Sequence, residues 1–169
     1  MCLHRNLFLG FMSLLTTSCT NIDCPLGNVV TINGGLYDAE TKKSYKLADT
    51  LTVSVSGLKD TILLNRALNI SSISLPLKYV AQEDTLLFCF SNAKNQTATD
   101  TLFIQHKAQP HFESIDCPTV VFHTIENIRW TKHAMRQMPL TIDSVSVTNK
   151  MVNYDNVENI KIYLRSLVY

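Results

Sequence analysis

The chain has 169 residues, of which 46% are hydrophobic and 17% are charged. This length suits a single domain, and the apolar fraction is sufficient to fill a core without metals or many disulfides. The 15 lysine and arginine side chains nearly balance the 14 aspartate and glutamate side chains. Proteins that bind a phosphate backbone carry a basic stripe or patch, so this balance argues against nucleic acid as a partner.

The first 18 residues have the features of an export signal. Arg5 precedes an uncharged apolar run over residues 7–15, which is typical of the apolar region of a signal peptide. The run is too short to cross a bilayer, because a membrane span needs roughly 20 apolar residues. We therefore predict a lipoprotein signal peptide over 1–18, a lipidated tether over 19–27 and a single domain over 28–169.

Cys19 is the predicted point of attachment to a membrane. The preceding segment, Leu15-Thr16-Thr17-Ser18, resembles the lipobox of bacterial lipoprotein signals, in which small residues precede a cysteine that is acylated. Thr16 occupies a position where leucine is usual. Cleavage near Ser18 by an ordinary signal peptidase, which would release an unlipidated secreted protein, is the alternative.

Three other cysteines remain after removal of the signal: Cys24, Cys89 and Cys117. Cys24 and Cys117 share the context Ile-Asp-Cys-Pro, in which proline marks irregular backbone that can accommodate a bridge. We predict a Cys24–Cys117 disulfide, with Cys89 buried as a small hydrophobe within its apolar run. The alternative is that all three thiols are reduced and buried.

The mature chain shows an alternation of apolar and polar residues with period two, which is typical of half-buried strands. The predicted strands cover residues 51–56, 72–78, 85–90, 102–106, 120–125, 145–148 and 159–165. Turn signals are Asn33-Gly34-Gly35, Ser56-Gly57, Ser91-Asn92 and Asn149-Lys150.

The only segment with helical character is 131–138, which is long enough for one or two turns. Many short strands without crossover helices predict an all-β fold with antiparallel pairing. We expect a β-sandwich, immunoglobulin-like or related, with at most one short helix.

The four histidines of the mature chain are scattered: His106, His111, His123 and His133. None belongs to a local metal-ligand pattern, so neither a metal site nor a cofactor is predicted. The segment from His133 to Met138 combines imidazole with two thioethers, which suits copper, but packing of the methionines in a core is the favoured interpretation. The sequence also lacks a phosphate-binding Gly-Lys-Ser/Thr loop and a Gly-x-Ser-x-Gly elbow, so no catalytic residue is predicted.

A tripeptide of aspartate, a hydroxyl residue and an aliphatic residue recurs along the chain. It begins at Asp49, Asp60, Asp84, Asp100 and Asp143. A structural explanation is that aspartate ends a turn and the next residues begin a strand. The tripeptide also resembles the acceptor pattern for O-glycosylation of exported Bacteroidota-type proteins, which would place sugars on Thr50, Thr61, Thr101 and Ser144. Thr85 opens an apparently buried strand and is a poor acceptor.

Short segments distributed along the mature chain are Asp23-Cys24, Leu36-Tyr37-Asp38, Ile73-Ser74-Leu75-Pro76-Leu77, Asp100-Thr101-Leu102, Phe112-Glu113-Ser114 ahead of Cys117, and Asn159-Ile160-Lys161-Ile162-Tyr163. Together they resemble an uncharacterised family of short Bacteroidota lipoproteins. The resemblance implies an envelope location and a β-rich fold, and it brings no activity and no site residue.

The residues that follow Cys19 carry a single acidic side chain, Asp23. Signals for display on the Bacteroidota cell surface tend to be acidic at this place. The expected location is therefore the outer membrane, with the protein facing the periplasm, and the cell surface is the alternative.

Three classes of function follow from these features. The favoured class is a non-catalytic module that binds an envelope protein or a glycan, for which Tyr37, Tyr79, Trp130 and Tyr154 are possible stacking residues. The second class is a structural subunit that assembles by strand addition. A metal carrier or an enzyme is the third.

Overall fold

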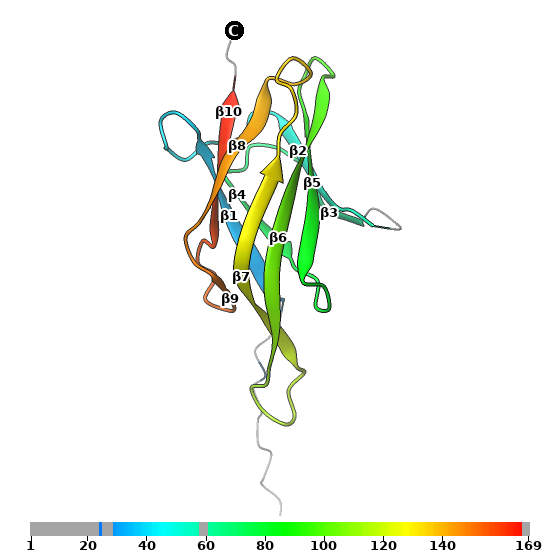
Figure 1. Ribbon diagram of the computed structural model, residues 1–169, viewed down its shortest axis with the longest axis vertical. Coiled ribbons are helices and arrows are strands. Elements are labelled where there is room, and N and C mark those ends of the chain that lie inside the picture. The colour runs from blue at the N-terminus through cyan, green and yellow to red at the C-terminus, as the bar shows by residue number, and fades with distance from the viewer. Residues whose placement is uncertain (1–23, 25–28, 58–60, 167–169) are drawn as a thin grey trace, which may run out of the picture.

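The computed structural model describes residue 24 and residues 29–57 and 61–166. This part of the chain consists of ten strands and their connections, without a helix (Figure 1). The strands are β1 (Thr31–Asp38), β2 (Thr50–Val55), β3 (Thr61–Ala67), β4 (Ser72–Pro76), β5 (Glu83–Ser91), β6 (Thr97–His111), β7 (Val120–Thr131), β8 (Leu140–Val147), β9 (Met151–Val152) and β10 (Ile160–Ser166). Among these residues, no helix could serve as a membrane span. The predicted all-β fold is confirmed.

The strands form two sheets that pack face to face as a β-sandwich. One sheet has the order β4-β1-β10-β8, and the other has the order β3-β2-β5-β6-β7-β9. Neighbouring strands are antiparallel, as predicted, except that β1 and β10 run parallel. A parallel pair needs a long crossover connection. Here all the strands between β1 and β10 provide it.

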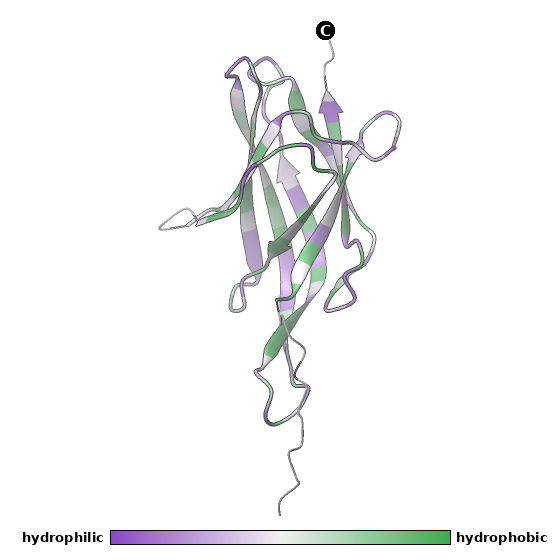
Figure 2. Ribbon diagram, turned by 180° about the vertical axis from the view of Figure 1, so that it is seen from behind, coloured by the Kyte–Doolittle hydropathy of each residue, from purple (hydrophilic) through white to green (hydrophobic). Residues whose placement is uncertain are grey.

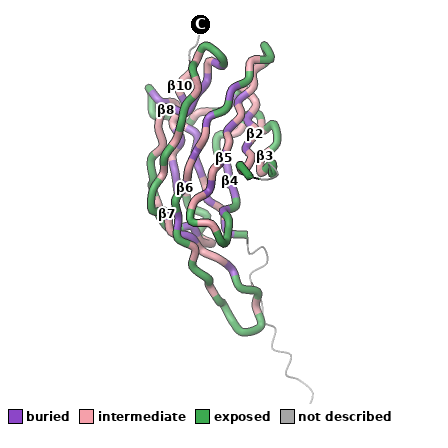
Figure 3. The backbone as a smooth tube through the Cα atoms, turned by 45° about the vertical axis from the view of Figure 1, so that its right-hand side comes forward, coloured by how far each residue is buried: buried purple, intermediate pink, exposed green. Residues whose placement is uncertain are grey.

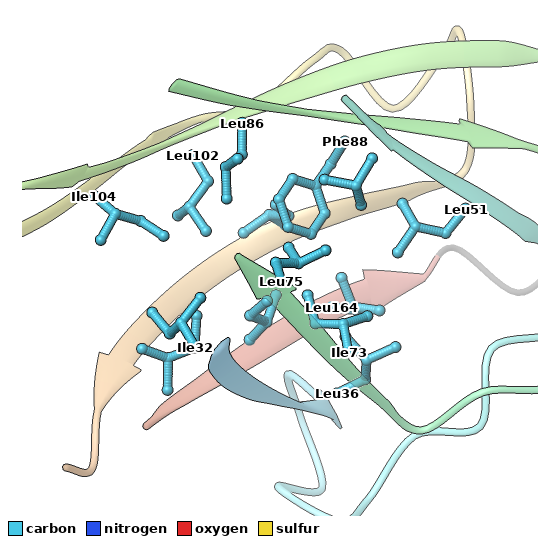
Figure 4. Packing of buried hydrophobic residues seen from close by; sticks show 14 of the residues in the cluster. Ile32, Leu36, Leu51, Ile73, Leu75, Leu86, Phe88, Leu102, Ile104 and Leu164 are labelled. Atoms are coloured by element: carbon cyan, nitrogen blue, oxygen red, sulfur yellow. The ribbon is translucent and has the colours of Figure 1, made fainter. Parts of the chain in front are cut away.

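The core lies between the two sheets, where alternate residues of each strand point inward. In β5 every second residue from Asp84 to Phe90 is buried, which is the alternation that a sheet with one covered face requires. The same alternation of hydrophobic and hydrophilic residues along the strands is visible in Figure 2. Side chains from both sheets meet in Figure 4: Leu51, Leu86, Phe88, Leu102 and Ile104 on one side, and Ile32, Leu36, Ile73, Leu75 and Leu164 on the other.

The prediction of a turn at Asn33-Gly34-Gly35 is wrong, because this segment lies inside β1. A Cβ atom on Gly34 would lie 3.2 Å from side-chain carbons of both Ile160 and Ile73. A Cβ atom on Gly35 would collide with the carboxylate of Glu158. The two glycines therefore allow close packing of neighbours on β1, which is the other common reason for glycine inside a strand.

The seven predicted strands correspond to β2, β4, β5, β6, β7, β8 and β10, although β6, β7 and β8 are longer than predicted. The prediction missed β1, β3 and the short β9. In β3 the burial pattern does not alternate, and the pairing with β2 contains two register shifts. An edge strand of this kind leaves no period-two pattern in its sequence.

The segment 131–138 does not form the short helix that its composition allowed. It contains a single turn, in which the Gln137 amide donates to the Ala134 carbonyl at 3.0 Å. Pro139 follows directly and disfavours helical backbone at the preceding residue.

The molecule is elongated, and its two ends differ (Figures 1 and 3). The connection between β6 and β7, residues 112–119, projects from one end, and we refer to it as the hairpin tip. The end of β10 lies at the opposite end, together with the β5–β6 turn and the β7–β8 connection. β6 alone runs most of this length, roughly 45 Å at about 3.3 Å per residue.

Candidate functional site

A hollow of about 880 Å³ opens at the end opposite the hairpin tip, and we call it the distal hollow. It is bounded by the residue before β2, the β5–β6 turn, the β7–β8 connection and the end of β10. The lining residues are Asp49, Asn92, Ala93, Lys94, Gln96, Ala134, Met135, Arg136, Pro139 and Ser166. Lys94 and Arg136 against Asp49 give the lining a surplus of positive charge.

One wall of the distal hollow is the β5–β6 turn, whose shape is set by Asn92. The Asn92 side-chain oxygen accepts the Lys94 and Gln96 amides at 3.0 and 3.1 Å. Its side-chain amide donates to the Gln96 side-chain oxygen at 2.8 Å. Asn95 has a φ of 58°, in the left-handed region that asparagine tolerates in turns. The wall is therefore held by local hydrogen bonds.

The other wall is the β7–β8 connection, which is fastened to the core by Asp100 of β6. The carboxylate of Asp100 is completely buried. One oxygen accepts both the backbone amide and the Nδ1–H of His133, each at 2.7 Å. The other accepts the Thr141 hydroxyl at 2.9 Å and the Ile142 amide at 2.7 Å. Four donors at the two ends of the connection thus converge on one carboxylate.

His133 completes this arrangement from within the connection. Its Nε2 lies 3.0 Å from the Met138 carbonyl, while its Nδ1 faces Asp100. A carbonyl and a carboxylate are both acceptors, so both contacts are hydrogen bonds only when the imidazole carries two protons. The ring thus lies between Asp100 of β6 and the Met138 carbonyl of its own connection.

The segment from His133 to Met138 therefore has a structural use. Met138 is fully buried in the core, as the favoured interpretation expected. Met135 lines the distal hollow instead. No group of three or more histidine, cysteine, aspartate or glutamate side chains that could hold a metal ion occurs within residues 24, 29–57 and 61–166.

A second buried polar chain joins Asp84, His106 and His123 near the other end of the core. The Nε2 of His106 lies 3.0 Å from Asp84, whose carboxylate also accepts the Lys78 amide at 2.9 Å. The Nδ1 atoms of His106 and His123 lie 3.1 Å apart and can share only one hydrogen. The two rings therefore cannot both be charged. The Nε2 of His123 is buried and has no hydrogen-bond partner among the residues that the structure describes.

The pKa values in this chain follow from burial and from neighbouring charge. Burial, and after it repulsion by His106, together lower the pKa of His123 to about 4, and the carboxylate of Asp84 only partly opposes them. Burial raises the pKa of Asp84, but the bonds from His106 and Lys78 outweigh it and hold this pKa below its ordinary value. At neutral pH His123 is thus a neutral core residue.

The buried His123 predicts a loss of stability in mild acid. Its pKa is about 4 in the folded chain, against about 6.5 in an unfolded chain. Between these values the unfolded chain takes up a proton that the folded chain does not. The free energy of unfolding therefore has its full value above pH 6.5. It decreases as the pH falls towards 4, by roughly 3 kcal/mol in all. Urea unfolding between pH 7 and 4.5 measures it.

Two variants isolate this effect. His123→Gln removes the titrating ring and should flatten the dependence of unfolding free energy on pH in this interval. His111→Gln removes a half-exposed imidazole that faces Glu113 at the surface, and should keep the slope of the parent chain. An identical slope in the parent chain and in His123→Gln would contradict the assignment.

Of the described cysteines, two are bonded to each other at one end of the sandwich and one is a free thiol on β5. Cys24 and Cys117 are joined by a disulfide with a Cα–Cα distance of 5.6 Å, so the start of the described chain is bonded to the hairpin tip. The expectation that Cys89 is buried is wrong, because it is a half-exposed free thiol. Its neighbours Phe88 and Phe90 fill the inward positions of β5 and turn Cys89 outward. The predicted lipidation site, Cys19, lies outside the described residues.

The predicted glycosylation sites lie on several strands. Thr61 is exposed, and Thr50, Thr101 and Ser144 are half-buried. The Thr50 hydroxyl donates to the Ser91 carbonyl at 3.0 Å. The aspartates of two tripeptides, Asp84 and Asp100, lie inside β5 and β6 and do not end a turn, so the structural explanation is wrong for these two. They are instead the buried acceptors described above. Glycosylation at Thr50, Thr61, Thr101 and Ser144 stays a prediction.

The aromatic residues considered for a glycan site are not brought together. Tyr37 lies beside Tyr163 and donates to Glu158 at 2.8 Å. The indole of Trp130 donates to the Asp143 carbonyl at 3.2 Å. Tyr154 packs against Phe122 and His111, and Tyr79 is exposed. Among the described residues, no ring contact joins any two of these four.

Comparisons with known proteins give one similarity. A family model matches residues 50–164, from the start of β2 into β10, and its description is a family of unknown function, DUF6452. The matched range contains Asp84, Asp100 and four of the five histidines of the chain. No curated protein and no solved structure matches.

Proposed function

Because the chain belongs to the family of unknown function DUF6452, whose description names no activity, we propose a function from the geometry of the molecule itself. The protein is a lipid-anchored module of the bacterial cell envelope that binds another envelope component without catalysing a reaction. Cys19 carries the lipid in the outer membrane of a Bacteroidota-type cell. The sandwich faces the periplasm, with display on the cell surface as the alternative.

This proposal rests on one observation: the end of the molecule that is tied to the chain near Cys19 is opposite the end that carries the distal hollow. The disulfide between Cys24 and Cys117 ties the chain just after Cys19 to the hairpin tip. The distal hollow lies at the opposite end of the long axis, where the β5–β6 turn and the β7–β8 connection meet. A disulfide is also characteristic of exported proteins, since cytosolic thiols are kept reduced.

The distal hollow has the properties of a surface that recognises a partner. Connections at one end of a rigid sandwich commonly carry binding function. Both walls are held by hydrogen bonds, so little order would have to be gained on binding. Lys94 and Arg136 favour a partner with acidic or polar groups, either an envelope protein or a glycan.

The edges of the six-stranded sheet favour this function over a polymer built by strand addition. The edge strand β3 has two register shifts against β2, and Arg66 within it has a φ of 45°. At the other edge of the same sheet, β9 is only two residues long. Irregular and short edges are features that oppose pairing with another chain.

Replacing Cys19 by alanine tests the anchor. Cells that express the parent chain should incorporate radiolabelled palmitate into it and retain it in the membrane fraction. Cys19→Ala should lose the label and move to the soluble fraction, because the attached lipid is the means of membrane attachment. Cys89→Ser is the matched control and should behave like the parent chain. Unchanged membrane partition of Cys19→Ala would contradict the anchor.

The same cells test the distal hollow after chemical cross-linking. A cross-linked species present in the parent chain should be lost when Lys94 and Arg136 are both replaced by glutamate. The same replacement at exposed Lys107 on β6 should leave it unchanged, since Lys107 is not part of the lining. A ladder of cross-linked multimers of the purified chain, with matching large species in size-exclusion chromatography, would instead indicate a structural subunit.

A further inference from the structure

We propose that the hairpin tip, residues 112–119, rests on the bilayer to which the protein is attached, with Phe112 and Ile115 in contact with lipid. The inference deepens the proposed function and rests on the lipidation of Cys19. It assigns a second membrane contact and an orientation to the sandwich.

The hairpin tip presents apolar side chains that nothing in the described chain covers. Phe112 is 67% exposed and Ile115 is fully exposed. The turn that carries them is held by its own hydrogen bonds, from the Cys117 amide to the Ser114 carbonyl at 3.3 Å and from the Asp116 amide to the Ser114 hydroxyl at 3.2 Å. Isolated exposed apolar residues are common on proteins. Here, however, two of them lie three residues apart in a connection that projects from one end of the molecule.

The disulfide places the hairpin tip within reach of the membrane. Cys24 follows Cys19 by five residues, which span at most about 18 Å when fully extended. The disulfide brings Cys117 to a Cα–Cα distance of 5.6 Å from Cys24, and Ile115 is two residues away from it. Without the bridge, the first anchored residue would be Thr31 in β1, at the end of a tether of up to about 43 Å. The bridge therefore keeps the hairpin tip near the lipid.

The charge of the hairpin tip specifies the kind of lipid surface. Residues 112–119 contain Glu113 and Asp116 and no lysine or arginine. Basic residues are what attract a protein to anionic headgroups. The contact must therefore be apolar, and it suits a zwitterionic surface better than an anionic one.

The lipid and the hairpin tip have different roles in this arrangement. Two apolar side chains are too few to retain a soluble protein at a membrane, whereas the acyl chains of Cys19 supply the attachment. The hairpin tip sets the direction of the long axis. It thereby holds the distal hollow away from the bilayer, by roughly the 45 Å that β6 spans.

Tryptophan quenching by brominated lipids tests the contact. The full lipidated chain is reconstituted into phosphatidylcholine–phosphatidylethanolamine vesicles with brominated acyl chains. Ile115→Trp is compared with Lys94→Trp at the distal hollow, and the signal of the single native Trp130 is subtracted using the parent chain. Both positions are exposed, so neither substitution disturbs the core. We expect quenching of Ile115→Trp at least threefold greater than that of Lys94→Trp.

The outcomes separate the hairpin tip from the anchor, because acylation is measured by mass on the same preparation. Acylated, vesicle-bound chains with equal quenching at both positions would overturn the contact and leave the anchor standing. Stronger quenching in anionic than in zwitterionic vesicles would also overturn it. A chain without acyl groups that stays in solution would overturn both the anchor and the contact.

Discussion

Replacement of Asp100 by alanine is expected to lower the free energy of unfolding by about 3–5 kcal/mol, because it leaves several buried donors without an acceptor. The carboxylate is completely buried and accepts four hydrogen bonds. Its removal leaves the His133 ring, the Thr141 hydroxyl and two backbone amides without their acceptor. Each unsatisfied buried group costs about 1–3 kcal/mol, although partial relaxation keeps the total below their sum.

Urea unfolding measured by circular dichroism at neutral pH checks the effect of Asp100→Ala. Asp155→Ala is the matched control, because Asp155 is exposed in the loop before β10, and its loss should stay within about 0.5 kcal/mol. Asp100→Asn should fall between the two, since one amide oxygen can still accept two donors. A loss below about 1 kcal/mol for Asp100→Ala would show that the β7–β8 connection is not fastened by this carboxylate.

Removal of the Cys24–Cys117 disulfide is expected to cost about 2–5 kcal/mol of unfolding free energy. The bridge joins residues separated by 93 positions in sequence and thus closes a long loop in the unfolded chain. For such a loop the chain-entropy model gives between about 4 and 5 kcal/mol. The folded chain without the bridge regains freedom of its N-terminal arm, because the first strand begins only at Thr31. The measured value should therefore lie at or below the model value.

The double variant Cys24→Ser, Cys117→Ser and the parent chain treated with a reductant should give the same midpoint of unfolding. Cys89→Ser is the control for loss of a thiol, and at a half-exposed position it should change stability by less than about 1 kcal/mol. An unchanged midpoint in the double variant would contradict a stabilising role for the bridge.

The strands that could be predicted are those whose burial pattern appears directly in the local sequence. Burial alternates along β2, β4, β5 and β10, so apolar and polar residues alternate in the sequence of these strands. In β1 the pair Gly34-Gly35 resembles a turn signal, because the side chains of Ile160 and Ile73, which pack closely over Gly34, lie far away in the chain. The local sequence could not show whether these glycines form a turn or a closely packed position inside a strand.

The contact between the buried histidines His106 and His123 depends on the pairing register of β6 and β7. His106 is opposite Ile125 and His123 is opposite Ala108, so the two histidines are diagonal neighbours across β6 and β7. A register shift between Gln105 and His106 helps to set this placement. No sequence pattern indicates this register shift, so the contact between the two histidines could not be predicted.

Composition, period-two alternation and the shared Ile-Asp-Cys-Pro segments were sufficient for the fold class and for the Cys24–Cys117 pairing as a hypothesis, because each is a property of neighbouring residues. The distal hollow, the convergence on Asp100 and the position of the hairpin tip arise only when strands distant in sequence are paired. Asp100 is 33 residues from His133 and 42 residues from Ile142. Contacts over such separations are selected by the packing of two whole sheets, which no local pattern encodes.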